Sequence, residues 1–239
     1  MTKLSSQRGM SLVEATIILL VIATLTAAIA PSMGDYLEDA RDTKAKGDVQ
    51  MLGLAVVRML RDTGLKGLKI DAGVAFTEAN RVDNLMSASG TAAINAGAAF
   101  ASGDINGGSI NWDGVDNDDT FENQLVNNTP GGVLASAYSI PASSNRGRGW
   151  RGSYLNVPAG EDPWGYKYYA NTVFLTVATD STAGAAEGNA SGFWAKDVVV
   201  LSAGPDNTIQ SDIAGSGSSG FGMATPNDDV IFVLQGNTR

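Results

Sequence analysis

The chain has 239 residues, a formal net charge of −9 at pH 7, and neither cysteine nor histidine. The missing residue types exclude thiol nucleophiles and serine–histidine catalysis, and they argue against zinc or copper sites. A metal site in this chain would use oxygen ligands, as Ca²⁺ sites do. The acidic balance argues against nucleic-acid binding.

An apolar run from Met10 to Ala30 follows a short, basic leader of residues 1–9. Its 21 residues are close to the roughly 20 that cross a bilayer as a helix. Lys3 and Arg8 precede the run and acidic residues follow it, so the positive-inside rule places the leader in the cytoplasm and the rest outside. One acid, Glu14, interrupts the run, and ionisable residues in spanning segments usually mark function.

Two simpler interpretations fit part of this pattern. Ala28-Ile29-Ala30 has the form of a signal-peptide cleavage site, but Pro31 directly after it should hinder cleavage. The run could also be a plain signal anchor that holds an extracytoplasmic binding or enzymatic domain. That alternative stays open, because the predicted topology does not exclude it.

The order of these features resembles the N-terminus of the type IV pilin superfamily, on the residues Gly9, Met10, Glu14 and Pro31. The resemblance implies that a prepilin peptidase cleaves after Gly9 and that Met10 is then N-methylated. It also implies that Glu14, the fifth mature residue, sets the register between subunits during assembly. Proline removes a helical hydrogen bond, so Pro31 should kink the helix.

Beyond Pro31, apolar residues from Met33 to Leu60 recur mostly every three or four positions, which predicts an amphipathic helix to about Arg61. Gly64 is the expected stop. We therefore expect one helix over residues 10–63, with a transmembrane segment at 10–31, and a globular head domain over residues 64–239. The first half needs lipid or sister helices to cover it, whereas the second half packs under its own domain.

Two motifs later in the chain, Gly149-Trp150-Arg151-Gly152-Ser153-Tyr154-Leu155 and Asp162-Pro163-Trp164-Gly165, carry a second resemblance. They are similar to the major pseudopilin of type II secretion systems, with Ser153 where that family has proline. The resemblance implies an α+β pilin fold, in which the long helix packs on a small antiparallel sheet formed by the last third of the chain. Residue types predict strands at 168–178, 196–202 and 229–234. Short helices are expected at 77–86 and 120–127, with a surface insertion at 87–103.

In the pseudopilin family, the loop between the last two strands binds Ca²⁺. Matched residue by residue, the resemblance assigns Asp206, Asp228 and Asp229 as ligands, although Asn207 stands where glycine is usual and the loop is longer. The residues alone offer an alternative site in the acidic run 113–119, where Asp113, Asp116 and Asp118 could converge on the ion. Both loops could instead be solvated acidic turns.

The resemblance implies a structural role and no enzymatic activity. The subunit would polymerise into a type IV pilus or a type II secretion pseudopilus, and the second set of motifs favours the pseudopilus. The implied partners are sister subunits, the prepilin peptidase, the inner-membrane assembly platform and minor pilins. The implied location is the bacterial inner membrane, and then a periplasmic or cell-surface filament.

Overall fold

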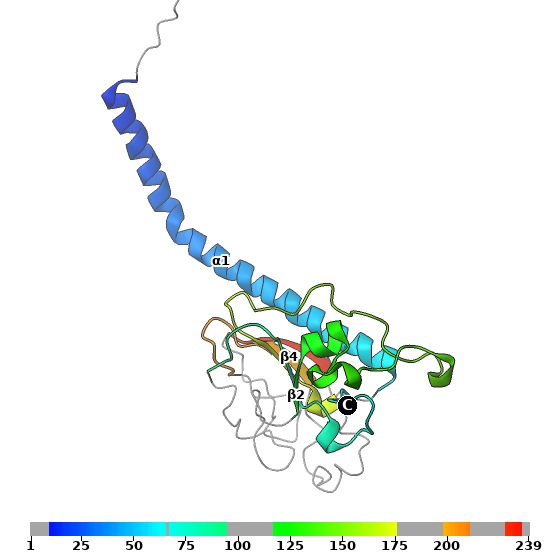
Figure 1. Cartoon of the computed structure of the whole chain (residues 1–239). Helices are drawn as coiled ribbons and strands as arrows, with labels where there is room; N and C mark the ends of the chain where they lie inside the picture. The colour runs from blue at the N-terminus through cyan, green and yellow to red at the C-terminus, as the bar shows by residue number, and fades with distance from the viewer. Residues whose placement is uncertain (1–9, 66, 95–116, 176–197, 211–227, 236–239) are drawn as a thin grey trace, which may run out of the picture. The chain divides into compact units, whose positions relative to one another are not determined.

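The computed structural model describes residues 10–65, 67–94, 117–175, 198–210 and 228–235. The chain is α+β, with one N-terminal helix, α1 (Leu12–Thr63), and a five-stranded sheet (Figure 1). The strands are β1 (Asn84–Met86), β2 (Asp118–Thr120), β3 (Tyr168–Asn171), β4 (Val198–Ser202) and β5 (Val230–Gln235). Short helical turns lie at Glu78–Asn80, Asn123–Asn127, Pro130–Gly132, Leu134–Ser136, Ser143–Asn145 and Thr172–Leu175.

Helix α1 is continuous through Pro31 and ends at Thr63, beside the predicted stop at Gly64. The Gly64 N–H donates to the Leu60 carbonyl at 2.8 Å, which closes the last turn. The chain divides into two compact units, residues 1–41 and residues 42–239, so the helix runs through both. Its stretch Leu12–Ile29 has a mean hydropathy of 2.4 and is long and apolar enough to cross a membrane.

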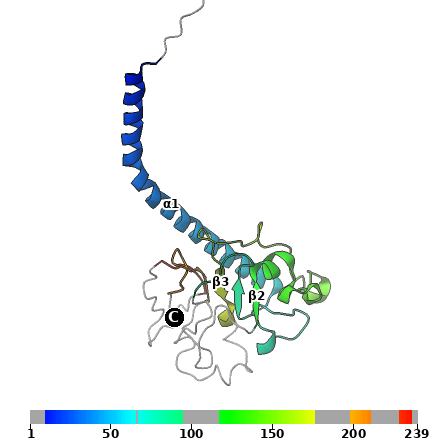
Figure 2. The ribbon, with the colours of Figure 1, turned by 60° about the vertical axis from the view of Figure 1, so that its left-hand side comes forward.

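The second unit has its core between α1 and the sheet. One stripe of the helix is fully covered, and its members are Ala45, Val49, Leu52, Val56 and Met59. The spacing of three or four residues is the pattern that predicted an amphipathic helix. The stripe packs on buried residues of the sheet that include Tyr168, Ala170, Val200 and Val230. Figure 2 shows β3 beside this half of α1.

Helix and sheet approach each other closely at Gly53. A Cβ built on this glycine would lie 2.5 Å from Cδ1 of Phe232 on β5. That distance is far inside van der Waals contact, so a side chain here would force Phe232 to move. A glycine in mid-helix, which is unfavourable by propensity, is therefore explained by packing.

The sheet corrects the prediction of a purely antiparallel sheet built from the last third of the chain. Its strand order is β2-β1-β3-β4-β5, and β1 pairs in parallel with β2, while the other pairs are antiparallel. The two additional strands come from the middle of the chain. Each has only three residues, Asn-Leu-Met and Asp-Asp-Thr, so neither has the alternation or β-branched content that marks a strand.

The prediction of a helix at 77–86 is wrong beyond one turn, because the side chain of Asn80 holds the preceding residues in a loop. Its side chain donates to the carbonyls of Asp71, Val74 and Ala75, and it accepts the Asp71 N–H. These local bonds compete with a helix. The chain then extends into β1.

Three further boundaries differ. Thr120, expected to start a helix, instead ends β2, and the helical turn lies at Asn123–Asn127. The strand expected at 168–178 stops at Asn171, whose Oδ1 accepts the Val199 N–H at 2.8 Å. A helical turn, Thr172–Leu175, follows. Strands β4 and β5 overlap the predicted ranges 196–202 and 229–234, of which residues 196 and 197 lie outside the described residues.

Candidate functional site

The N-terminal part of α1 presents an apolar surface with one acid. None of Leu12–Ile29 is buried within the protein. Glu14 lies exposed in the first turn of the helix, and Met10, just before it, is 66% exposed. Gly9 lies outside the described residues. Exposed apolar side chains continue past Pro31 at Met33, Tyr36 and Leu37. This surface needs cover that residues of the described structure do not provide.

The C-terminal loop brings Asp206 beside Asp228, although 22 residues separate them. The Asp206 N–H donates to Asp228 Oδ2 at 3.3 Å. Asp206 Oδ1 accepts the Thr208 N–H at 2.8 Å, and its Oδ2 accepts Nε2 of Gln210 at 2.6 Å. Asp229, which is buried, accepts the Gln210 N–H through Oδ2 at 2.8 Å. The two ends of the loop are therefore joined through their predicted metal-site residues.

Gly204 makes this approach possible. It has φ = 68°, and a Cβ there would lie 2.4 Å from the Asp228 carbonyl oxygen. A side chain would thus be strained by both the backbone conformation and the contact. Asn207, three residues on, also has positive φ, at 58°. Asparagine tolerates this conformation better than most residues, so Asn207 can hold the turn.

Several oxygens in this loop are buried without a donor. Asn207 Oδ1, Gln210 Oε1 and Asp228 Oδ1 have no hydrogen-bond partner among the described residues. Burial, with a contribution from the charge of Asp206, raises the pKa of Asp228, although the bond from the Asp206 N–H opposes the rise. Carboxylate and amide oxygens are ligands that Ca²⁺ takes. The donor set therefore fits a hard cation, although no group of three acidic side chains within the described ranges is placed together to hold one.

Asp162 supports the loop from outside and was not predicted as part of the site. Its Oδ2 accepts the Ser202 hydroxyl at 2.6 Å, and Ser202 Oγ accepts the Gly204 N–H at 3.2 Å. Its Oδ1 accepts the N–H groups of Trp164 and Tyr166. The Asp-Pro-Trp-Gly turn and the end of β4 therefore share one buried carboxylate. The sequence does contain a signal for this role of Asp162, because Asp is favoured at the first position of such a turn.

The alternative acidic run is only partly described. Asp113 and Asp116 lie outside the described residues. Asp118 is on β2, where its Oδ1 accepts Nδ2 of Asn84 at 3.1 Å. Its neighbour Asp119 is buried and accepts four hydrogen bonds, from Thr120, Asn123, Gln124 and Gly131. Within this run, Asp118 and Asp119 thus serve the sheet and the turn after it.

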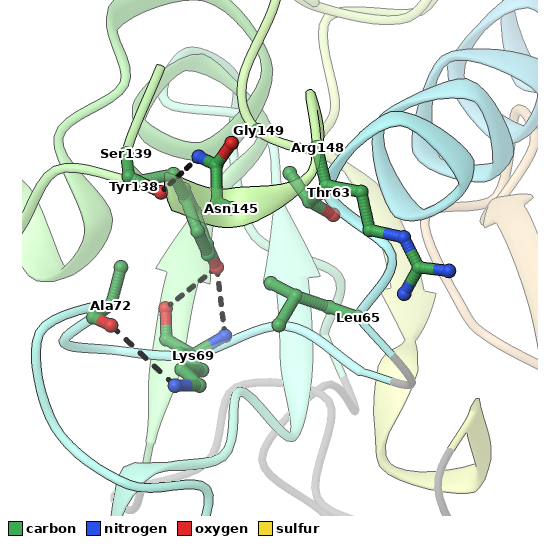
Figure 3. Close-up of a pocket in the computed structure, with 9 residues that line it drawn as sticks. All are labelled: Thr63, Leu65, Lys69, Ala72, Tyr138, Ser139, Asn145, Arg148 and Gly149. Carbon is green, nitrogen blue, oxygen red and sulfur yellow. Dashed lines mark hydrogen bonds between the residues drawn. The ribbon is translucent and has the colours of Figure 1, made fainter. Parts of the chain in front are cut away.

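A cavity of about 200 Å³ lies where the end of α1 meets the loop 138–149, shown in Figure 3. Tyr138 Oη donates to Gln124 Oε1 at 2.8 Å and accepts the Lys69 N–H at 2.9 Å. The Lys69 ammonium group donates to the carbonyls of Ala72 and Val74. Burial lowers the pKa of Lys69 and raises that of Tyr138. Figure 3 shows the Arg148 guanidinium pointing away from Lys69 and Tyr138.

Comparisons with known proteins gave no match to any family model, curated protein or solved structure. The pilin resemblance therefore rests on the residues of the sequence itself.

Proposed function

We propose that this protein is the structural subunit of a membrane-derived filament, either a type IV pilus or a type II secretion pseudopilus. The observation that carries the proposal is the contrast within α1. One stripe of its last third is buried by the head, whereas Leu12–Ile29 is apolar, contains Glu14 and is not buried at all. Lipid covers such a stretch before assembly, and sister helices cover it in a filament.

The rival is an extracytoplasmic domain on a plain anchor. A plain anchor does not explain Glu14, because a carboxylate in the bilayer is costly and an anchor gains nothing from it. It also leaves Met33, Tyr36 and Leu37 exposed to water beyond the apolar stretch, at 55%, 70% and 59% of their full area. Packing between sister helices gives both features a role.

The test is Glu14→Ala in the full chain, expressed in cells that assemble it. The variant should be processed after Gly9, inserted in the membrane and folded, but its filament yield should fall severely. Electron microscopy and sheared-filament yield measure assembly, and mass spectrometry reads the N-terminus. Gly9→Leu is the matched control, because it should keep the leader and block assembly at an earlier step. Normal filaments from Glu14→Ala, or a wild-type chain that keeps residues 1–9, would contradict the proposal.

We propose Ca²⁺ as the ion of the C-terminal loop. The support is the buried oxygens of Asn207, Gln210 and Asp228 that lack donors, together with the raised pKa of Asp228, which marks a place where negative charge is unfavourable in the fold. A cation bound there would join the two ends of a long loop whose closure costs entropy. Asp206 and Asp228 would supply charge, and Asp229 would hold the adjoining backbone.

Calcium that binds only the folded state adds RT ln(1 + [L]/Kd), or about 2.7 kcal/mol at a hundredfold excess over Kd. The melting temperature of the detergent-solubilised chain should therefore rise in millimolar Ca²⁺ and fall in chelator. Asp206→Ala should remove most of this response, and Asp116→Ala should leave it. An unchanged melting curve in chelator would dismiss the metal. A response lost only in Asp116→Ala would move it to the acidic run.

A further inference from the structure

A cluster of arginines surrounds the C-terminal end of α1 in a protein that is acidic overall. We define the arginine cluster as Arg61, Arg146, Arg148 and Arg151. Arg61 and Arg151 both approach Oδ1 of Asp62, at the long distances of 3.9 and 4.0 Å. Arg148 lies over Gly64, since a Cβ there would be 2.7 Å from Arg148 Cδ. One aspartate thus faces two of the four cations.

The loop that carries three of these arginines is held firmly. Asn145 Oδ1 accepts the Ala142 N–H at 2.8 Å, and its Nδ2 donates to the Ile140 carbonyl at 2.9 Å. The Gly149 N–H donates to the Asp62 carbonyl at 2.9 Å, which ties the loop to α1. The Arg151 guanidinium donates to the Gly147 carbonyl at 2.8 Å. The backbone that carries these arginines is therefore held in place, and Arg151 is held by its side chain as well.

The cluster is not neutralised within its own chain. The guanidinium groups of Arg146 and Arg148 are exposed and have no hydrogen bond or ion pair among the described residues. An open hollow beside the loop is lined by Arg146 and Arg151. Guanidinium groups bind carboxylates through paired hydrogen bonds, so this surface suits an acidic partner.

The chain contains an acidic segment of matching character directly after its apolar stretch. Asp35, Glu38, Asp39 and Asp42 lie within eight residues of α1, all on its accessible surface. Glu38 pairs with Arg41 at 3.5 Å and Asp42 with Lys46 at 2.6 Å. Asp35 and Asp39, which share a face at i and i+4, have no such partner among the described residues.

We infer that the arginine cluster of one subunit binds the acidic segment of another subunit, with Asp35 and Asp39 facing Arg146 and Arg148. The inference rests on the proposed filament, in which a head meets the helix of a second copy. Complementary charge across an interface fixes register and excludes wrong pairings. This contact would supply register outside the membrane, where Glu14 cannot act.

A charge exchange tests the contact in assembling cells. Asp35→Lys with Asp39→Lys should lower filament yield by about tenfold, as like charges then face each other. Arg146→Glu with Arg148→Glu should do the same, and all four changes together should restore most of the yield. Lys44→Glu with Arg58→Glu is the matched control for the arginine reversal, since it makes the same change in net charge at exposed positions outside both surfaces and should leave the yield near the wild-type level.

Cysteine cross-linking reads the contact directly, because the chain has no cysteine of its own. Subunits carrying Asp39→Cys and subunits carrying Arg148→Cys are co-expressed, and oxidised filaments should give a mixed disulfide dimer. A pair of Asp39→Cys and Lys167→Cys subunits should not.

The outcomes separate this inference from the proposed function. If the wild-type chain forms filaments and both charge-reversed variants form them equally well, the contact is wrong and the filament proposal stands. The same conclusion follows if the cysteine pair gives no mixed dimer. The contact is also wrong if the arginine reversal lowers the filament yield and the added aspartate reversal does not restore it. That result would point to an anionic lipid surface as the partner of the arginine cluster. A wild-type chain that forms no filament overturns both.

Discussion

The two ends of α1 have similar apolar residues and the same secondary structure, but they are covered differently. Leu19 and Leu52 are both leucines in one continuous helix, yet Leu19 is 66% exposed and Leu52 is fully buried. The sheet of the second unit covers only the stripe from Ala45 to Met59. Hydrophobic character alone therefore does not say what a helix packs against. The uncovered end marks the surface that lipid or another subunit must cover.

Truncation of one leucine at each end of α1 should affect the stability of the head very differently. Leu52→Ala should destabilise the head by about 2–5 kcal/mol, because it leaves a cavity in a packed core. Leu19→Ala should change head stability by less than about 0.5 kcal/mol, as expected for a site outside that core. Thermal and denaturant unfolding of the full chain in detergent measures both.

In filament assembly we expect Leu19 to matter, although it does not matter for head stability. Leu19→Ala should lower filament yield while the head keeps its melting temperature, because the side chain has cover only in lipid or a filament. Equal effects of the two substitutions on unfolding would show that the apolar stretch is buried in the isolated subunit, and would contradict the comparison.

The covered part of the helix was accessible to sequence reasoning, and the sheet only partly so. Apolar spacing from Val49 to Met59 has one physical meaning, a helix with a buried stripe. Strand β4, with three successive valines, is equally plain. Strands β1 and β2 are not, because three-residue strands gain their stability from neighbours. Their pairing depends on where the chain returns, which no local pattern records.

The candidate metal loop shows the same division. Asp206, Asp228 and Asp229 could be found from the resemblance, and the fold brings the two ends of their loop together. Asn207 and Gln210 could not be found, because amides become ligand candidates only when their oxygens are buried without donors. The arginines of residues 146–151 are visible in the sequence. Their meeting with Arg61 is not, since it depends on the loop bonding to Asp62.

A polar contact also joins the covered part of α1 to the sheet. Tyr168 of β3 is fully buried, and its hydroxyl donates to Asp48 Oδ2 on α1 at 2.8 Å. Burial first, and then the hydrogen bond to Asp48, raise the pKa of Tyr168 above its ordinary value of 10.0. At neutral pH, Tyr168→Phe should lower the free energy of unfolding by about 1 kcal/mol, the usual net value of one such bond.

The difference between wild type and Tyr168→Phe should then shrink as the pH rises above about 10, the unperturbed tyrosine value. Because the pKa of Tyr168 is higher in the folded than in the unfolded state, the folded protein keeps the phenolic proton to higher pH. The stability that the Tyr168 hydroxyl contributes is therefore present below pH 10 and is lost as the pH rises. Phenylalanine has no such proton, so the variant lacks this loss. Denaturant unfolding at several pH values between 7 and 11 measures it, with Tyr36→Phe, which is 70% exposed on the uncovered part of α1, as control. A gap that widens with pH, or a Tyr36→Phe curve that follows Tyr168→Phe, would show that the helix–sheet contact does not hold this proton.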